Sequence, residues 1–347
     1  MTSWHHARSA LLAASTALPL LVALPAHAQE TTVEGVDATP GAKAAVTGQM
    51  TVRETGPLAR DIELTYADAT TGQQIKDYDV ELTQELHILA VDEQLNELVH
   101  EHVRAADPDG RFAGQLQFPH AGTYHIYTDA VPSGLGQQVQ RFDVSVGSGE
   151  GGAPATTAAD VAAGPISSSD GAYTVELDAR ELRAGAEGVM SLHVLKDGQP
   201  ATDLAPYLGV AAHVVLIQAD DLAYVHAHAL AGDDASHADM GHGGHDMPAM
   251  APANGADHSA GHGGHEMAQE PAPMDTHAGG HGGSHDMGHD ADANAEGDPI
   301  MGTPGTVPAD LTVYVTPPAA GTYGMWIEFV GGTEVITVPF KIDVPAS

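Results

Sequence analysis

Short runs of apolar residues, bounded by Gly, Pro, Asp and Ser, recur along most of the chain. Four such runs, rich in β-branched and aromatic side chains, lie at residues 61–66, 86–91, 122–127 and 141–146. Runs of this length between turn residues predict strands, and several in succession predict an antiparallel β-sandwich. We therefore expect an all-β protein of Ig-like sandwich modules, with a β-barrel as the structural alternative.

The strand pattern occurs twice. Reading without gaps, Gly72 aligns with Gly198 and His102 with His228, and the tetrapeptide Ala-Gly-Thr-Tyr occurs at 121–124 and again at 320–323. Self-similarity of this kind is the signature of an internal repeat. It predicts two tandem modules, at residues 48–147 and 170–345.

Two further segments lack the strand pattern. Residues 148–169 are rich in Gly, Ala, Ser and Pro, a composition typical of a flexible linker. Residues 231–308 interrupt the second module and contain no aromatic side chain. A segment with so little apolar bulk does not compensate the entropy of ordering, so we expect this insert to be disordered without a ligand.

The N-terminal residues 1–28 read as a secretory signal peptide. Arg8 precedes an apolar run at 10–24, which is short for a membrane helix, and Ala26-His27-Ala28 is a small-x-small cleavage pattern. A membrane anchor is the alternative interpretation. Cleavage near Ala28 would send a protein without stable membrane insertion to the periplasm or the extracellular space.

The composition narrows the function. With 12 basic and 47 acidic residues, the net charge of −35 repels nucleic acid and anionic lipid. The absence of Cys excludes disulfides, zinc fingers, iron–sulfur ligation and blue-copper sites. Histidine, with 22 residues, outnumbers Lys and Arg together. The chemistry of this chain therefore has to be sought in its histidines.

Three histidines repeat between the two copies, at the spacing His-x12-His-x-His. If Val91 pairs with Asn96 across a turn at 92–95, His87 lies opposite His100, and the second copy is built in the same way. The third histidine shares their face, because side chains two residues apart on a strand point the same way. The candidate metal ligands are His87, His100 and His102 in the first copy and His213, His226 and His228 in the second.

Three imidazoles on one face predict a metal site with an open coordination position, and purely structural histidines are the alternative. Candidate fourth ligands occur in one copy only. They are His120 and His125 in the first copy, and His193 and Met325 in the second.

The insert repeats a second set of candidate ligands, in which a pair of histidines precedes a methionine. These candidates are His242, His245, Met247, His262, His265, Met267, His281, His285, Met287 and His289. Imidazole suits copper, zinc and nickel, whereas thioether sulfur favours Cu(I). The methionines therefore favour copper over zinc or nickel. A solvated acidic linker is the alternative.

The hairpin sequences carry a family resemblance. The stretch from His87-Ile-Leu-Ala-Val to Val99-His100-Glu-His102, and its counterpart ending in Asp221-Leu-Ala-Tyr-Val-His226-Ala-His228, resemble bacterial secreted YtkA-like or heavy-metal-associated β-sandwich proteins. The chain departs from their pattern in lacking Pro after His-x-His. The insert is similar in composition to the Met/His-rich segments of periplasmic copper-resistance proteins. Both resemblances imply metal binding outside the cytoplasm.

We therefore expect a periplasmic or secreted copper-binding protein that serves sequestration, tolerance or delivery. Its ligands would be metal ions, and a metal transporter or efflux system is a candidate partner. Zinc or nickel binding is the first alternative, and a cell-surface adhesion or scaffold module is the second. A three-histidine site could also activate water, but no general base is evident, so we expect no enzymatic activity.

Overall fold

The structure, a computed structural model, describes residues 30–39, 41, 44–148, 156–231 and 303–347. In these ranges every regular element is a β-strand except one 3-10 turn, η1 (Val161–Ala163), which confirms the all-β prediction. The predicted signal peptide and most of the predicted insert lie outside the described residues. The described part of the chain contains no helix with the length and apolarity of a membrane span.

Residues 30–148, called the first half below, form two antiparallel sheets. The first contains β1 (Glu30–Glu34), β3 (Val46–Glu54), β4 (Ala59–Asp68) and β8 (Arg111–Gln117), in that order. The second has the order β2 (Val36–Asp37), β10 (Gln138–Val146), β9 (Gly122–Pro132), β6 (Leu86–Asp92) and β7 (Leu98–Val103), with β5 (Tyr78–Asp79) beside β9. Inward-facing residues of both sheets, such as Met50, Leu64 and Ile126, share one core.

The second half, residues 156–231 and 303–347, is a single continuous sheet. Its order is β11 (Ala159–Asp160), β21 (Glu334–Val344), β20 (Gly321–Gly331), β17 (Ala212–Gln218), β18 (Tyr224–Ala231), β19 (Asp310–Val315), β14 (Gly188–Lys196), β13 (Tyr173–Asp178) and β12 (Ile166–Asp170). The short strands β15 (Gln199–Pro200) and β16 (Leu204–Ala205) pair with β14 and β20. Because β12 also lies against β21, the sheet curls until it is almost closed.

The two halves have the same strand order, as the sequence repeat predicts. The series β1-β3-β4-β8 corresponds to β12-β13-β14-β19, and β7-β6-β9-β10 corresponds to β18-β17-β20-β21. The halves differ in how their two layers are joined. In the second half β18 pairs with β19, with Ala229 opposite Val313, and this ladder joins the two layers into one sheet.

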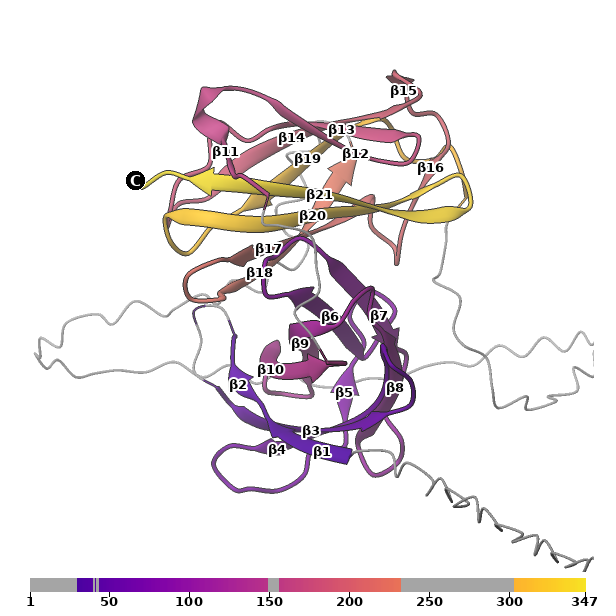
Figure 1. Cartoon of the computed structure of the whole chain (residues 1–347), viewed down its shortest axis with the longest axis vertical. Helices are drawn as coiled ribbons and strands as arrows, with labels where there is room; N and C mark the ends of the chain where they lie inside the picture. The colour runs from indigo at the N-terminus through magenta and orange to yellow at the C-terminus, as the bar shows by residue number, and fades with distance from the viewer. Residues whose placement is uncertain (1–29, 40, 42–43, 149–155, 232–302) are drawn as a thin grey trace, which may run out of the picture.

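The halves are stacked along the long axis of the molecule, with the β17–β18 hairpin on the side that faces the first half (Figure 1). Strands β6 and β17 are buried along their whole length, because each is covered on both faces. On β6, Ile88 points into the core of its own half, whereas Leu89 joins a separate cluster with Val215 and Trp326 of the second half. This shared cluster, called the junction, continues the face on which the histidines lie.

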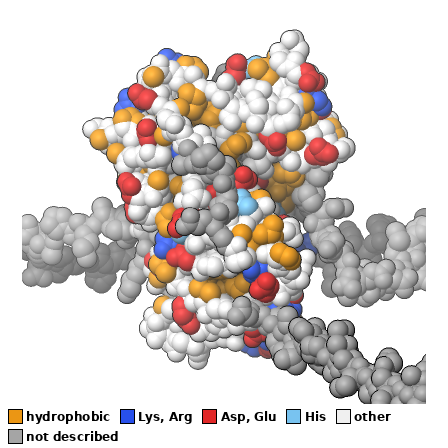
Figure 2. Space-filling model, in the orientation of Figure 1, with side chains coloured by type: hydrophobic (Ala, Val, Ile, Leu, Met, Phe, Trp, Pro, Cys, Tyr) orange, Lys and Arg blue, Asp and Glu red, His pale blue; other side chains and the backbone are white. Residues whose placement is uncertain are grey.

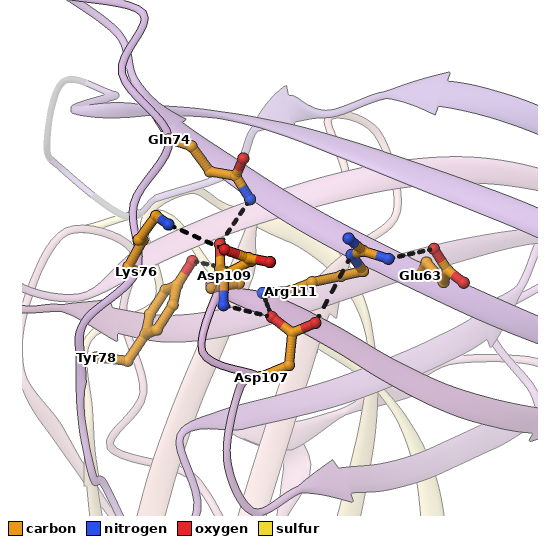
Figure 3. A network of polar contacts seen from close by, with 8 residues as sticks. Glu63, Gln74, Lys76, Tyr78, Asp107, Asp109 and Arg111 are labelled. Atoms are coloured by element: carbon orange, nitrogen blue, oxygen red, sulfur yellow. Dashed lines mark hydrogen bonds and ion pairs between the residues drawn. The ribbon is translucent and has the colours of Figure 1, made fainter.

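The connection after β7 is short and held by polar contacts (Figure 3). Asp107 Oδ1 accepts from the backbone N–H of Asp109 and Arg111, which closes the turn. Lys76 Nζ lies 3.1 Å from Asp109 Oδ1, and Gln74 Nε2 donates to the Asp109 carbonyl. The second half carries the insert at the same topological place, between β18 and β19.

Candidate metal centre

The β6–β7 hairpin brings His87, His100 and His102, called the first triad, to one face. Each offers a ring nitrogen, and these atoms lie within 4.8 Å of one another. The predicted register is wrong by two residues, because Val91 pairs with Leu98 and His87 lies opposite His102. The turn is longer than predicted, since the Asp92 side chain accepts the backbone N–H of both Asn96 and Glu97.

The second triad, His213, His226 and His228, repeats this arrangement on β17 and β18. Its ring nitrogens also lie within 4.8 Å of one another, and His213 pairs with His228 rather than with the predicted His226. Here the Gln218 side chain accepts the N–H of Asp220 and Asp221 and lengthens the turn. An error of two residues leaves every histidine on its predicted face, because the side-chain period of a strand is two.

Contacts of one ring nitrogen fix which nitrogen of His87 and of His100 is open to a ligand. His87 Nε2 donates to the Glu81 carbonyl at 3.2 Å, so His87 Nδ1 carries the lone pair. In the first triad His87 Nδ1, His100 Nε2 and His102 Nε2 are all buried and without a hydrogen-bond partner. Buried polar atoms of this kind require an explanation, and a metal ion bound between them is a direct one.

In the second triad His213 Nε2 donates to the Tyr207 carbonyl at 3.3 Å, which leaves His213 Nδ1 with a lone pair. That atom lies 3.0 Å from His226 Nε2. Two nitrogen ligands of one tetrahedral ion, with bonds of about 2.0–2.1 Å, are separated by roughly 3.3 Å. In the metal-free protein the two nitrogens share a hydrogen bond, and an ion bound by both would replace that hydrogen bond.

The two triads adjoin one another at the junction. The ring centroid of His87 lies 6.4 Å from that of His213 and 6.0 Å from that of His226, and the centroids of His100 and His213 are 6.0 Å apart. Figure 2 shows a small area of histidine surface at this level, between the halves. The repeat in the sequence thus produces one cluster of six imidazoles rather than two remote sites.

Two buried carboxylates face this cluster from opposite sides. Glu328 on β20 of the second half contacts His100 Nδ1 of the first triad through Oε2. Asp129 on β9 of the first half places Oδ2 3.7 Å from His226 Nδ1 of the second triad. Each acid stands beside its own half's triad in the sheet, Asp129 opposite His87 and Glu328 opposite His213, but reaches across the junction.

Uncharged donors hold both carboxylates in place. Gln137 Nε2 and Tyr224 Oη donate to Asp129, and Thr337 Oγ1 donates to Glu328. Among the described residues no Lys or Arg forms an ion pair with either acid. Buried carboxylates without a permanent cation favour the binding of positive charge nearby.

Burial sets the protonation of the imidazoles. Desolvation, with neighbouring histidines acting in the same direction, lowers the pKa of His87 to about 4 and places the pKa of His213 well below its ordinary value. The pKa of His102 is lowered by the same causes. Burial acts to raise the pKa of Glu328, but contacts with His100, the hydrogen bond from Thr337 and the nearby His226 together outweigh it and lower the pKa. At neutral pH these three histidines are neutral, the form that binds metal.

The other predicted ligands do not join the triads. His125 and His193 pair with Asp143 and Asp310, each at 2.6 Å, and Met325 is buried in the core of the second half. His120 Nδ1 donates to the Ala121 carbonyl. The predicted ligands of the insert, from His242 to His289, lie outside the described residues.

Sequence reasoning missed the two acids, although a signal for them exists. Asp129 and Glu328 each lie eight residues after the start of the repeated Ala-Gly-Thr-Tyr, so they occupy equivalent positions in the two copies. Extending the repeat alignment beyond that tetrapeptide would have found them. Nothing in the sequence shows that each acid serves the opposite copy.

The chain belongs to a family defined by a domain of unknown function, DUF8832. The family profile matches residues 37–148 and 167–255, which together make up more than half of the chain. Both stretches include a triad and its hairpin. The chain has no match among curated proteins and none among solved structures.

Proposed function

We propose that this protein binds copper outside the cytoplasm, with the two triads as its ordered sites and the insert as a tethered collector. The observation that carries the proposal is the convergence of His87 Nδ1, His100 Nε2 and His102 Nε2, all buried and unpartnered. The remaining nitrogen of His87 and of His100 is held by a carbonyl or a carboxylate. Such outer partners orient imidazoles that ligate metals.

The preference for copper rests on the sequence of the insert. Its methionines, among them Met247, Met267 and Met287, supply soft thioether ligands that zinc and nickel do not need. The insert follows directly after β18, which carries His226 and His228. A collector tethered there would raise the effective concentration of metal at the triads. Zinc or nickel would use the same imidazoles and remains the competing identity.

The predicted signal peptide and the fold support the proposed location and role of the protein. A signal peptide at 1–28 would deliver the chain to the periplasm or the extracellular space. In these oxidising compartments a chain without Cys has no thiol to be oxidised. We also infer that each half derives from one Ig-like sandwich module of the heavy-metal-associated kind. Two histidine triads fit sequestration of metal, or its delivery to a transporter or efflux system, better than they fit adhesion. We propose no catalytic activity.

The metal content of the full mature chain tests this function. After loading with Cu(II) and passage over a weak chelating resin, the variant His100→Ala/His102→Ala should retain one ion fewer than the parent. His226→Ala/His228→Ala should also lose one ion. The control His193→Ala removes a histidine that pairs with Asp310 at the surface and should lose none. Unchanged copper content in both triad variants would exclude the assignment.

A further inference from the structure

We propose that the two triads form a single dinuclear centre, completed across the junction by a carboxylate from the opposite half. This inference rests on the proposed function, because it requires that each triad binds an ion. It adds that the ions are close enough to interact and that Asp129 and Glu328 are positioning residues for the triad of the other half.

The spacing of the rings supports a dinuclear centre. His87, His100, His213 and His226 lie at the contact between the triads, where centroids of opposing rings are 6.0–6.4 Å apart. Each bound ion would lie about 2.0–2.1 Å from its own nitrogens, which places the two ions on the order of 10 Å apart or less. The rings of the two triads are therefore direct neighbours at these three pairs.

The packing supports it independently. Leu89, Val91 and Tyr127 of the first half and Val215, Ile217 and Trp326 of the second form a buried cluster next to the histidines. The Tyr127 hydroxyl donates to the Leu222 carbonyl at 2.9 Å, and Lys341 Nζ donates to the Gln94 carbonyl at 2.6 Å. An apolar cluster edged by directional hydrogen bonds fixes one relative placement of the halves, so the separation of the triads is fixed as well.

The charge balance of the site supports a role of Asp129 and Glu328 at the triad of the opposite half. Two divalent ions bring four positive charges into a site whose ligands are neutral imidazoles. Asp129 and Glu328 are 2% and 3% exposed and supply negative charge there. Glu328 contacts the Nδ1 of His100 while the Nε2 of the same ring is open, so the acid holds the tautomer that ligates through Nε2. Asp129 lies near the corresponding nitrogen of His226, with Oδ2 3.7 Å from Nδ1.

Electron paramagnetic resonance of the copper-loaded full chain tests the dinuclear centre. A coupled Cu(II) pair gives a half-field transition and dipolar splitting that isolated ions lack. The parent should show both, and His100→Ala/His102→Ala and His226→Ala/His228→Ala should each lose them while keeping the signal of the remaining triad. The insert is identical in all three proteins, so any coupling within it cancels in the comparison.

The outcomes separate this inference from the function on which it rests. If each variant loses one copper ion but the parent spectrum equals the sum of isolated signals, the triads are independent sites and the dinuclear centre is wrong. If neither variant loses copper, the proposed function fails first.

The crossed roles of the acids need their own comparison. In a chain that keeps only the first triad, through His226→Ala/His228→Ala, Glu328→Gln should weaken Cu(II) binding about tenfold or more, as loss of an outer partner of a ligand does. Asp129→Asn in the same chain should have little effect. In a chain that keeps only the second triad, the two effects should exchange. In the chain that keeps only the first triad, Glu328→Asp should retain part of the affinity that Glu328→Gln loses. A loss confined to the triad of the same half would overturn the assignment, since general destabilisation does not predict an exchange.

Discussion

The rings of Tyr127 and Tyr224 stack across the junction, with centroids 5.3 Å apart and planes inclined by 21°. Tyr127 comes from β9 of the first half and Tyr224 from β18 of the second. The hydroxyl of Tyr224 donates to Asp129 Oδ2 at 3.1 Å, and Asp129 faces His226. The aromatic contact that joins the halves is therefore linked through one carboxylate to a histidine of the second triad.

Two neighbouring residues on β6 pack in different places, Ile88 in the core of the first half and Leu89 in the junction. Ile88→Ala and Leu89→Ala should each cost about 2–4 kcal/mol, because both side chains are fully buried. Leu89→Ala opens a cavity between the halves and should split thermal unfolding of the metal-free protein into two transitions. Ile88→Ala weakens only the core of the first half and serves as the matched control. Differential scanning calorimetry distinguishes the two, and identical single transitions would show that the Leu89 contact is not what couples the halves.

The metal-free protein should be sensitive to acid. The unfolded chain binds a proton at His87 below its ordinary pKa of about 6.5, whereas the folded state resists protonation until about pH 4. Stability from this group is therefore full above pH 6.5 and is lost as pH falls toward 4, by about 3 kcal/mol at most.

His87→Gln keeps an N–H that can reach the Glu81 carbonyl but does not titrate. Urea unfolding of the metal-free variant at pH 7 and pH 5 should show a smaller loss of stability than the parent shows. Part of the dependence should persist, because burial also lowers the pKa of His102 and His213. Equal losses in parent and variant would contradict the assigned shift of His87.

The turn before β8 requires a glycine. Gly110 has φ +79°, and a Cβ there would lie 2.1 Å from the Ile75 carbonyl oxygen. Gly110→Ala should therefore cost at least about 2 kcal/mol in the free energy of unfolding, since backbone strain and a backbone clash add. Gly72→Ala is the control, because φ is +70° but nothing lies within 4 Å. It should cost about 1 kcal/mol. Chemical denaturation of both variants tests the difference.

The methionines of the insert should discriminate between metals. Changing Met240, Met247, Met250, Met267, Met274 and Met287 to Leu removes sulfur but keeps apolar size. The Cu(I) affinity of the isolated peptide 232–306 should fall about tenfold or more, roughly 1.4 kcal/mol, whereas Zn(II) affinity should hardly change. Competition with a chelator measures both. If the Leu peptide binds Cu(I) as the parent does, zinc or nickel becomes the better assignment.

The sequence predicts both triads because a register error of two residues leaves each side chain on the same face of its strand. Side-chain caps from Asp92 and Gln218 lengthen the turns, and no propensity rule gives the length of such a turn. The resulting shift of two residues changes the partner of each histidine but not its face. The error is therefore visible in the pairing of His87 with His102 and harmless to the site.

The junction was not predicted, although the run 86–91 carries a signal for it. Its near-continuous apolar character is typical of a strand that is buried on both faces, whereas a strand with one solvated face alternates. The sequence does not say what covers the second face. That Leu89 meets Val215 depends on contacts between distant parts of the chain, which local pattern does not encode.

The exchange of Asp129 and Glu328 has the geometry of an isologous dimer interface, in which each subunit completes the other. A lone module of this kind would obtain the crossed carboxylate only by pairing with a second copy of itself. Joining the copies in one chain removes the dependence of that assembly on protein concentration and releases the copies from symmetry. Here one acid is longer than the other by a methylene and only one copy carries the insert, so the two ions would enter chemically distinct environments.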